Sequence, residues 1–281
     1  MAMAGSRAPF RTVSVYAVLV GFSLFCLFPF LWMVDTALKP TEEILSDAPT
    51  LLIRAPTLSH FSDVLLRSPF LVYFRNSVVV ALASTVVTLV VSIFASYALS
   101  RWSHLGIARL VGGALVVSQM IPGVLLLVPL YVLMQRLGLL STYASLIIVY
   151  CTFMVPLVVF MLKGFFDTIP RELEEAAEMD GCTPVGFIWR ILLPISAPGL
   201  LATGVFAFVT AWNEFMFGYV LINDDARRTL TPGIMLFKGS HVTDWGSLMA
   251  ASVLAVLPVG LCFVYLQRFM VEGLASGAVK G

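Results

Sequence analysis

The chain has 281 residues, of which 59% are apolar and 12% are charged, and its formal net charge is +1. Charged residues make up about a quarter of a typical soluble domain. The composition therefore excludes an ordinary soluble protein and indicates an integral membrane protein in contact with a lipid bilayer. The 17 basic residues are scattered along the chain, which argues against nucleic acid as a partner.

Six apolar segments are each long enough to cross the hydrocarbon core of a bilayer, which takes about 20 helical residues. They are predicted at 13–38, 77–99, 111–134, 143–166, 200–221 and 247–269. All six are expected to be helical, because a lipid-exposed backbone must form its hydrogen bonds within itself. The predicted fold is an all-α polytopic membrane protein with six transmembrane helices, forming a single transmembrane domain over 1–281.

Prolines lie inside four of these spans, at Pro29, Pro122, Pro129, Pro156 and Pro258. Each removes one backbone hydrogen-bond donor and favours a kink, which would suit a bundle that moves. Prolines are also simply commoner in membrane helices than in soluble ones, so both interpretations stay open. At the start of the fifth span, Gly199 and Thr203 form a small-x-x-x-small pattern that predicts close approach of another helix.

Lysine and arginine are almost evenly divided between the two sides of the predicted bundle, so the positive-inside rule gives only a slight preference. Arg7 and Arg11 flank the first span, and Arg101 and Arg109 flank the second connection. We therefore expect cytoplasmic termini, with an amino-terminal tail at 1–12 and a carboxy-terminal tail at 270–281.

Neither the cysteines nor the histidines form a pattern that predicts a metal or redox site. The four cysteines include no C-x-x-C pair, and the three histidines, His60, His104 and His241, lie far apart in polar connecting segments. We expect the cysteines to be packing residues and the histidines to be solvated.

The connection 167–199, between the fourth and fifth spans, contains the most polar helix-forming stretch of the chain. Pro170 suits a first helical turn, and the residues from Arg171 to Met179 all favour helix. Gly181 suits a left-handed cap that ends this helix. Thr183 followed by Pro184 then predicts the start of a second helix, which Pro194 ends.

The first of these two helices carries five acidic residues against a single arginine, so it is expected to stay out of the lipid. Ala176, Ala177 and Gly181 leave it a patch without bulk, a shape that suits a groove on another protein. An ordinary solvated loop helix would have the same pattern, so the residues by themselves leave both interpretations open.

This segment closely resembles the EAA loop, the signature of permease subunits of binding-protein-dependent ABC importers. The resemblance lies in residues at fixed spacing: Glu175, Ala176, Ala177, Asp180, Gly181, Phe187, Ile191, Leu193 and Pro194. Cys182 stands where the family usually has alanine, a small departure between two small residues.

The resemblance extends over a core permease region at 70–275 and on to the end of the chain. Three stretches look like the carbohydrate branch of the family, in particular its maltose-type second permease: Tyr97–Arg101, Trp212–Phe215 and the tail at 267–281. The implied solute is a sugar or related polyol, and a non-sugar solute such as glycerol phosphate is the alternative.

In that family the EAA loop forms a cytoplasmic coupling helix that fits a cleft of a separate ATPase subunit. The resemblance therefore implies two ABC ATPase subunits, a non-identical sister permease and an extracytoplasmic solute-binding protein. It also implies the cytoplasmic (inner) membrane of a bacterium or archaeon.

No enzymatic motif is present, so we predict no catalytic residue, no metal and no cofactor bound by this chain. A phosphate-binding P-loop needs a lysine followed by Ser or Thr, and the four lysines are followed by Pro40, Gly164, Gly239 and Gly281. There is also no G-x-S-x-G or H-E-x-x-H motif. ATP is therefore expected to be used by a partner subunit.

Glu214 is the one carboxylate well inside a predicted span, and an ionisable group at that depth usually faces a cavity or a polar partner. With Trp212 and Asn213 it forms the candidate translocation path, although a hydrogen bond that fixes helix packing explains Glu214 equally well. The alternatives from other classes are an ion-coupled carrier that uses Glu214 as its relay and a membrane scaffold without a path. One deep acid and no obvious inverted repeat weigh against the carrier.

Overall fold

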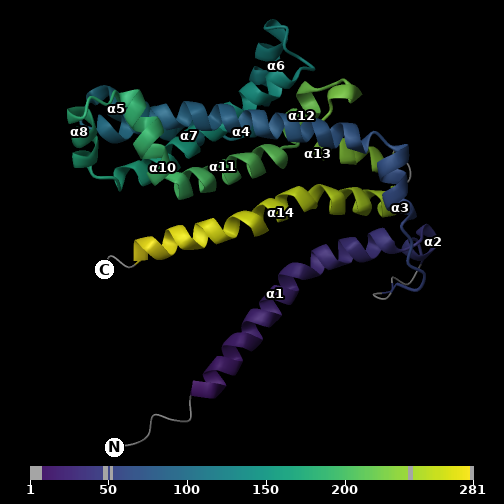
Figure 1. The fold of residues 1–281 in the computed structure, drawn as a ribbon. Helices are drawn as coiled ribbons and strands as arrows, with labels where there is room; N and C mark the ends of the chain where they lie inside the picture. Colours follow the sequence, from purple (N-terminus) through teal and green to yellow (C-terminus); the bar gives the residue numbers. More distant parts are fainter. Residues whose placement is uncertain (1–7, 47–49, 51–52, 240–242, 279–281) are drawn as a thin grey trace, which may run out of the picture. The chain divides into compact units, whose positions relative to one another are not determined.

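The computed structural model of this chain describes residues 8–46, 50, 53–239 and 243–278, with only the backbone of 8–11 and 265–278. Within these ranges the regular elements are helices (Figure 1). One isolated antiparallel bridge joins Lys238 and Thr243. The predicted all-α polytopic fold is confirmed.

Four helices in the described ranges are long and apolar enough to cross a membrane. They are α1 (Ala8–Leu38), α4 (Phe70–Arg101), α7 (Tyr143–Asp167) and α14 (Trp245–Ala278). Each contains one of the predicted spans. Helix α1 includes part of the predicted tail at 1–12 and α14 includes most of the predicted tail at 270–281, while 1–7 and 279–281 lie outside the described residues.

The third predicted span, 111–134, is not one straight helix. It consists of α5 (Gly106–Gln119), the short turn η2 (Gly123–Leu126) and α6 (Leu127–Arg136), and the chain bends by 94° between α5 and the rest. The bend follows from Pro122, which has no N–H to donate and which drives the residue before it out of the helical conformation.

The fifth predicted span, 200–221, is also broken. Helix α11 (Ala197–Trp212) ends where the prediction expected it to continue, and the chain resumes as α12 (Met216–Leu221) after three residues. On its other side α11 meets the helical segment Pro184–Ile195 at 86°. If each bent pair counts as one span, the described residues contain six spans by length and composition.

Short helices and turns make up the connections. Their bounds are α2 (Thr41–Ile44), α3 (Ser59–Ser62), η1 (Asp63–Arg67), α8 (Arg171–Met179), α9 (Pro184–Phe187), η3 (Ile188–Leu192), α10 (Leu193–Ile195), η4 (Asp225–Arg227), α13 (Leu230–Ile234) and η5 (Met235–Phe237).

The chain divides into two compact units, one made of Met1–Phe70 and Ile234–Leu257, the other of Leu71–Gly233 and Pro258–Gly281. The second unit is built around α7, which is buried along much of its length, and α4 and α11 lie beside it (Figure 1). The face of α4 toward the interior carries small hydroxyl side chains: Ser77, Ser84, Thr88, Ser92, Ser96 and Ser100. Their small size allows close packing, as where the Thr88 hydroxyl contacts Cys151 Sγ of α7 at 3.4 Å.

Gly199 of α11 is buried against the ring of Phe165 in α7, and Thr203 one turn later is fully buried. The close approach that the small-x-x-x-small pattern predicted is confirmed, and α7 is the helix that approaches.

Asn76 fixes the other end of this unit. Its buried amide donates to the carbonyl oxygens of Ala226 and Arg228 at 3.0 and 2.9 Å and accepts a hydrogen bond from the Tyr143 hydroxyl at 2.7 Å. The loop after α12 is thereby held against the starts of α4 and α7.

In the first unit, the end of α1 is held by a buried ion pair between Lys39 and Asp35, whose Nζ and Oδ2 lie 2.5 Å apart. The His60 ring is buried, with Nε2 3.0 Å from the Lys39 carbonyl oxygen and the backbone of Gly246 against its face. The expectation that the histidines are solvated is therefore wrong for His60, although His104 is exposed, and His241 lies outside the described residues.

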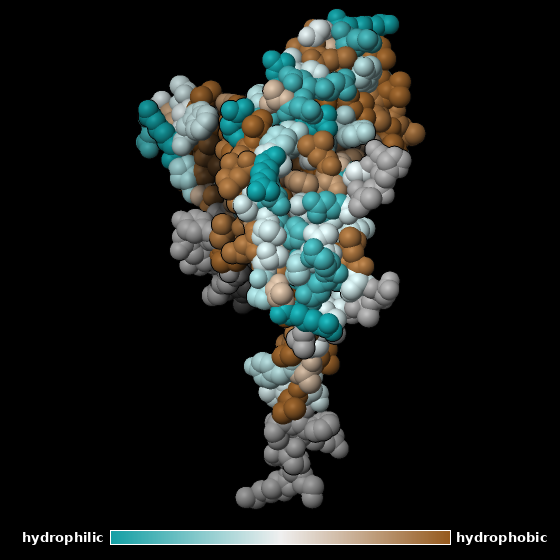
Figure 2. All heavy atoms as spheres, turned by 90° about the vertical axis from the view of Figure 1, so that its right-hand side faces the viewer, coloured by the Kyte–Doolittle hydropathy of each residue, from teal (hydrophilic) through white to brown (hydrophobic). Residues whose placement is uncertain are grey.

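Large hydrophobic side chains are exposed along the spans, as in α1, where Val18, Phe22 and Phe25 are 70%, 66% and 77% exposed. Figure 2 shows hydrophobic surface directly beside hydrophilic surface on one face of the molecule. Patches of this kind mark contact with lipid or with other subunits.

Candidate functional site

The polar segment between α7 and α11 begins with α8, whose limits follow from its sequence. Pro170 precedes the first residue, and Glu172 and Glu174 lie in the first turn, where the helix dipole favours negative charge. The helix ends at Met179, and Gly181 just beyond it has a φ of 77°, the left-handed conformation that glycine adopts without strain. The predicted helix and its glycine cap are confirmed.

A second helical stretch starts at Thr183, as the sequence predicted. The Thr183 hydroxyl accepts a hydrogen bond from the backbone N–H of Gly186 at 3.1 Å, and Pro184 occupies the first turn. The stretch continues through α9, a π-helical turn at η3 and α10, and it ends at Ile195, one residue beyond the predicted Pro194.

Helix α8 has two different faces. Glu172, Glu175, Ala176 and Met179 follow the spacing of one helix face, and all four are exposed, Met179 to 88%. Ala177 faces the protein interior and is 6% exposed. The outer face is therefore acidic with one large apolar side chain, Met179, that is almost fully exposed.

The nine residues predicted to couple to a partner differ in their exposure. Five are exposed: Glu175, Ala176, Asp180, Gly181 and Pro194. Three are buried and one is half-buried: Ala177, Phe187 and Leu193, then Ile191. The exposed five are available to a partner, whereas the others pack the segment onto its own unit.

Several exposed apolar side chains of this segment were missed by the sequence analysis, and three of them lie on α8, α9 and η3. They are Met179, Val185 at 56% exposed and Trp189 at 52% exposed. The sequence did indicate the exposure of Met179, because this residue follows the spacing of the acidic face of the helix and is therefore not expected to be buried. Exposed apolar side chains close together on a polar segment make it a candidate contact surface.

The three residues of the candidate translocation path occupy different environments. Trp212 is 3% exposed and packs between Phe208, with ring centroids 5.7 Å apart, and the edge of Phe74, at 5.5 Å. Asn213 is exposed, and Glu214 is half-buried in the break between α11 and α12. The indole of Trp212 is thus enclosed by protein, whereas the side chains of Asn213 and Glu214 are accessible.

The Glu214 carboxylate caps α12. Its Oε1 accepts the backbone N–H of Phe217 at 2.8 Å and its Oε2 accepts that of Gly218 at 2.9 Å. These are two of the N–H groups that a helix start leaves without partners. The same side chain borders a cavity of about 180 Å³ lined also by Gly123, Tyr150, Phe153, Met154, Thr210, Ala211 and Phe217.

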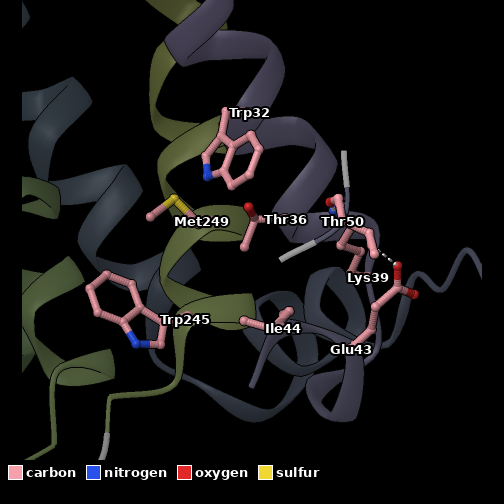
Figure 3. Close-up of a pocket in the computed structure, with 8 residues that line it drawn as sticks. All are labelled: Trp32, Thr36, Lys39, Glu43, Ile44, Thr50, Trp245 and Met249. Atoms are coloured by element: carbon pink, nitrogen blue, oxygen red, sulfur yellow. Dashed lines mark hydrogen bonds between the residues drawn. The ribbon is translucent and has the colours of Figure 1, made fainter. Parts of the chain in front are cut away.

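A second cavity, of about 270 Å³, lies in the first unit (Figure 3). Trp32 of α1 and Trp245 of α14 border it, and Lys39 and Glu43 supply its charged groups. Both charges already have protein partners: Lys39 binds Asp35 and the Thr50 carbonyl oxygen, and Glu43 accepts the Thr50 hydroxyl at 2.9 Å. Among the described residues no group of three His, Cys, Asp or Glu side chains could hold a metal ion.

Continuous and bent membrane spans define a polytopic membrane subunit, and a polar helix with an exposed acidic face lies between two of those spans. The chain belongs to the family of binding-protein-dependent transport system inner membrane components, whose model matches residues 93–275. The match includes all of α7 to α11. The family expected from the EAA segment is confirmed, and the chain is a transport component, not an enzyme.

Relatives match the chain over nearly its whole length. It is 38% identical to the inner membrane ABC transporter permease protein YcjP of Escherichia coli, over 99% of this chain and 100% of the relative. It is 36% identical to the sulfoquinovosyl glycerol transport system permease protein SmoH of Agrobacterium fabrum, over 98% and 95%.

A solved structure shares the fold. A chain of a bacterial ABC transporter involved in the import of the acidic polysaccharide alginate superposes with a TM-score of 0.82 at 18% identity, over 95% of this chain and 99% of that chain. These comparisons favour an ABC permease over the ion-coupled carrier and the scaffold.

Proposed function

We propose that this permease forms half of the translocation path of an ATP-driven importer for a sugar or related polyol, and that a separate ATPase drives it by docking on α8 and the turn after it. The observation that carries the proposal is the outer face of α8, where exposed acids surround the almost fully exposed Met179. A partner that covers this face needs an apolar pocket for Met179 and basic groups for the acids.

The partners of the proposed importer are two ABC ATPase subunits, a non-identical sister permease and an extracytoplasmic solute-binding protein. One chain with six spans and large exposed apolar surfaces supports a second membrane subunit as the partner for part of that surface. The proposed location is the cytoplasmic membrane of a bacterium or archaeon, with both termini and α8 on the cytoplasmic side.

A sugar as the solute is supported by the carbohydrate-branch residues Tyr97–Arg101 and Trp212–Phe215 and by the 36% identity to a permease named for a glycosyl glycerol. Asn213 and Glu214 would then lie at the path or its mouth, where an amide and a carboxylate can bind sugar hydroxyls. Uptake of labelled disaccharides and of glycerol phosphate into vesicles that contain the whole complex separates this proposal from the non-sugar alternative.

The docking is tested by cross-linking. We replace the four native cysteines by serine, introduce Met179→Cys, label it in native membranes with a maleimide that carries a short photoactivatable benzophenone, and illuminate the membranes. We expect a cross-linked product that mass spectrometry identifies as a P-loop ATPase.

Leu66→Cys is the matched control, because Leu66 is 79% exposed in η1 and is proposed to lie on the opposite side of the membrane. It should capture no ATPase. Capture of no nucleotide-hydrolysing subunit by Met179→Cys, or its labelling from outside intact cells, would contradict the proposal.

A further inference from the structure

Glu174 and Glu175 are neighbours on α8 but have opposite surroundings. Glu175 is exposed, whereas the Glu174 side chain is only 14% exposed and its Oε2 lies 2.6 Å from Nε of Arg101. The Arg101 side chain, at the end of α4, is 7% exposed. The Tyr97 hydroxyl, one turn earlier on α4, donates to the other carboxylate oxygen of Glu174. This carboxylate is therefore held from two positions of the same membrane helix.

Arg101 also binds the end of α7. Its Nη1 lies 3.4 Å from the carbonyl oxygen of Phe166 and 3.3 Å from that of Ile169, and it donates to both. In return, Arg171 of α8 donates from Nη2 to the Arg101 carbonyl oxygen at 3.0 Å. The planar guanidinium presents several donors in a fixed geometry, so one side chain joins α4, α7 and α8.

Tyr97 adds a contact to the second helical stretch of the polar segment. Its ring packs against that of Phe187 in α9, with centroids 6.5 Å apart, and against Trp102 at 5.9 Å. We call Tyr97, Arg101 and Glu174 the clasp. The clasp touches both parts of the segment that surround the exposed turn at Gly181.

The ion pair of the clasp differs from the other ion pairs among the described residues. Those join side chains three or four positions apart: Asp35 with Lys39, Asp63 with Arg67, Lys163 with Asp167, Asp224 with Arg227, and Asp225 with Arg228. Only Arg101 and Glu174 connect distant helices, and both are largely buried. A buried ion pair is weak evidence for stability, because desolvation offsets the attraction. Its two side chains come from helices far apart in the sequence, which suits a connection that holds those helices in a fixed position.

We propose that Arg101 is a positioning residue that makes the coupling helix α8 and the membrane helices α4 and α7 move as one body. The inference rests on the proposed function, in which an ATPase moves α8 from outside. Along the chain, α8 follows directly on a membrane helix only at its start, where Thr168 to Pro170 join it to α7, while its other end continues through the turn at Gly181 into α9. A short connection at one point can bend, whereas the clasp attaches the other side of α8 to α4.

The test measures whether α8 and α4 keep their distance during nucleotide turnover. Spin labels are placed at Glu178→Cys on α8 and Val91→Cys on α4, both at exposed positions, in the assembled complex with its native cysteines replaced. The distance distribution is recorded without nucleotide and after trapping with ATP and vanadate. With the clasp intact we expect the distance to change by less than about 2 Å, the range of shifts between packed helices.

The clasp is then opened with Arg101→Met together with Glu174→Gln, which removes both charges and leaves an acceptor for Tyr97, so that no unpaired buried charge remains. We expect this double variant to co-elute with its partners. On trapping, the distance should shift or broaden by more than about 2 Å, beyond ordinary packing shifts. Arg67→Met with Asp63→Asn, at an exposed local ion pair, should leave the distance as it is in the unaltered chain.

A merely structural role for the ion pair predicts an unchanged, narrow distance in the stable double variant, and that result would overturn the inference. A large shift in the unaltered chain would also overturn it, since α8 would then move independently. If the double variant does not co-elute with its partners, the unaltered chain still provides a test, because a large change in its α8–α4 distance on trapping would overturn the inference. Failure of the proposed function is distinguishable, because the unaltered chain would then recover no ATPase and trap no nucleotide.

Discussion

Replacement of Gly199 by alanine should destabilise the protein, whereas the same replacement at Gly204 on the same helix should not. A methyl group at Gly199 would overlap ring atoms of Phe165 in α7, a side chain whose ring lies directly over the α11 backbone. A methyl group at Gly204 would meet only Leu89 Cδ1, at 3.4 Å, which is an ordinary contact. Both glycines lie within α11, so the two variants differ mainly in the space available.

The magnitude follows from two opposing effects. Alanine is favoured over glycine within a helix by about 1 kcal/mol, a gain that both variants share approximately. Forcing an extra methyl group into a packed contact costs about 1–3 kcal/mol. The overlap should therefore separate the two variants by about 1–3 kcal/mol, or about 2–12 °C in melting temperature for a chain of this size.

The assay is thermal unfolding of the purified complex in detergent, followed by tryptophan fluorescence and by retention on size exclusion. Gly204→Ala should melt at or above the temperature of the unaltered chain, and Gly199→Ala below it. Adding Phe165→Leu to Gly199→Ala should recover part of the loss, because the smaller side chain vacates the space. Equal melting temperatures for the two glycine variants would refute the argument from close packing.

Two further substitutions test the helix caps. Glu214→Ala should lower the free energy of unfolding by about 1–2 kcal/mol through the loss of its two backbone hydrogen bonds at the start of α12, measured by thermal melting, whereas Glu214→Gln keeps one acceptor and should lose less. If Glu214→Gln assembles and melts normally but abolishes uptake, the carboxylate acts in the path rather than in packing. Thr183→Ala should cost about 1 kcal/mol by removing the hydroxyl that accepts the Gly186 N–H. Thr183→Ser, which retains the hydroxyl, is the control. Equal melting temperatures for Thr183→Ala and Thr183→Ser would contradict a stabilising role for the Thr183 hydroxyl.

The sequence predicted the helices of the polar segment closely because their limits depend on local chemistry. Pro170, Gly181 and Thr183 act within one turn of the backbone, through a missing N–H, a left-handed φ and a side-chain hydrogen bond. The four continuous spans were predictable for a similar reason, since their length in apolar residues matches the thickness of a bilayer.

The bends were less predictable, because composition alone does not distinguish a kinked span from a broken one. Pro122 lies in a break of the chain, whereas Pro156 and Pro258 lie inside continuous helices. Proline therefore breaks one span and is accommodated inside two others, because neighbouring helices decide whether the freed backbone groups find other hydrogen-bond partners.

The sequence by itself determined that this is a helical membrane protein, where its four continuous spans lie, and that an acidic two-helix segment joins the fourth predicted span to the fifth. Only the tertiary structure decided which acid of that segment is exposed and which is buried. Glu174 and Glu175 are chemically the same and adjacent, so no local rule separates them. Their difference depends on Arg101, which lies far away along the chain and reaches Glu174 only because α4 and α7 pack side by side.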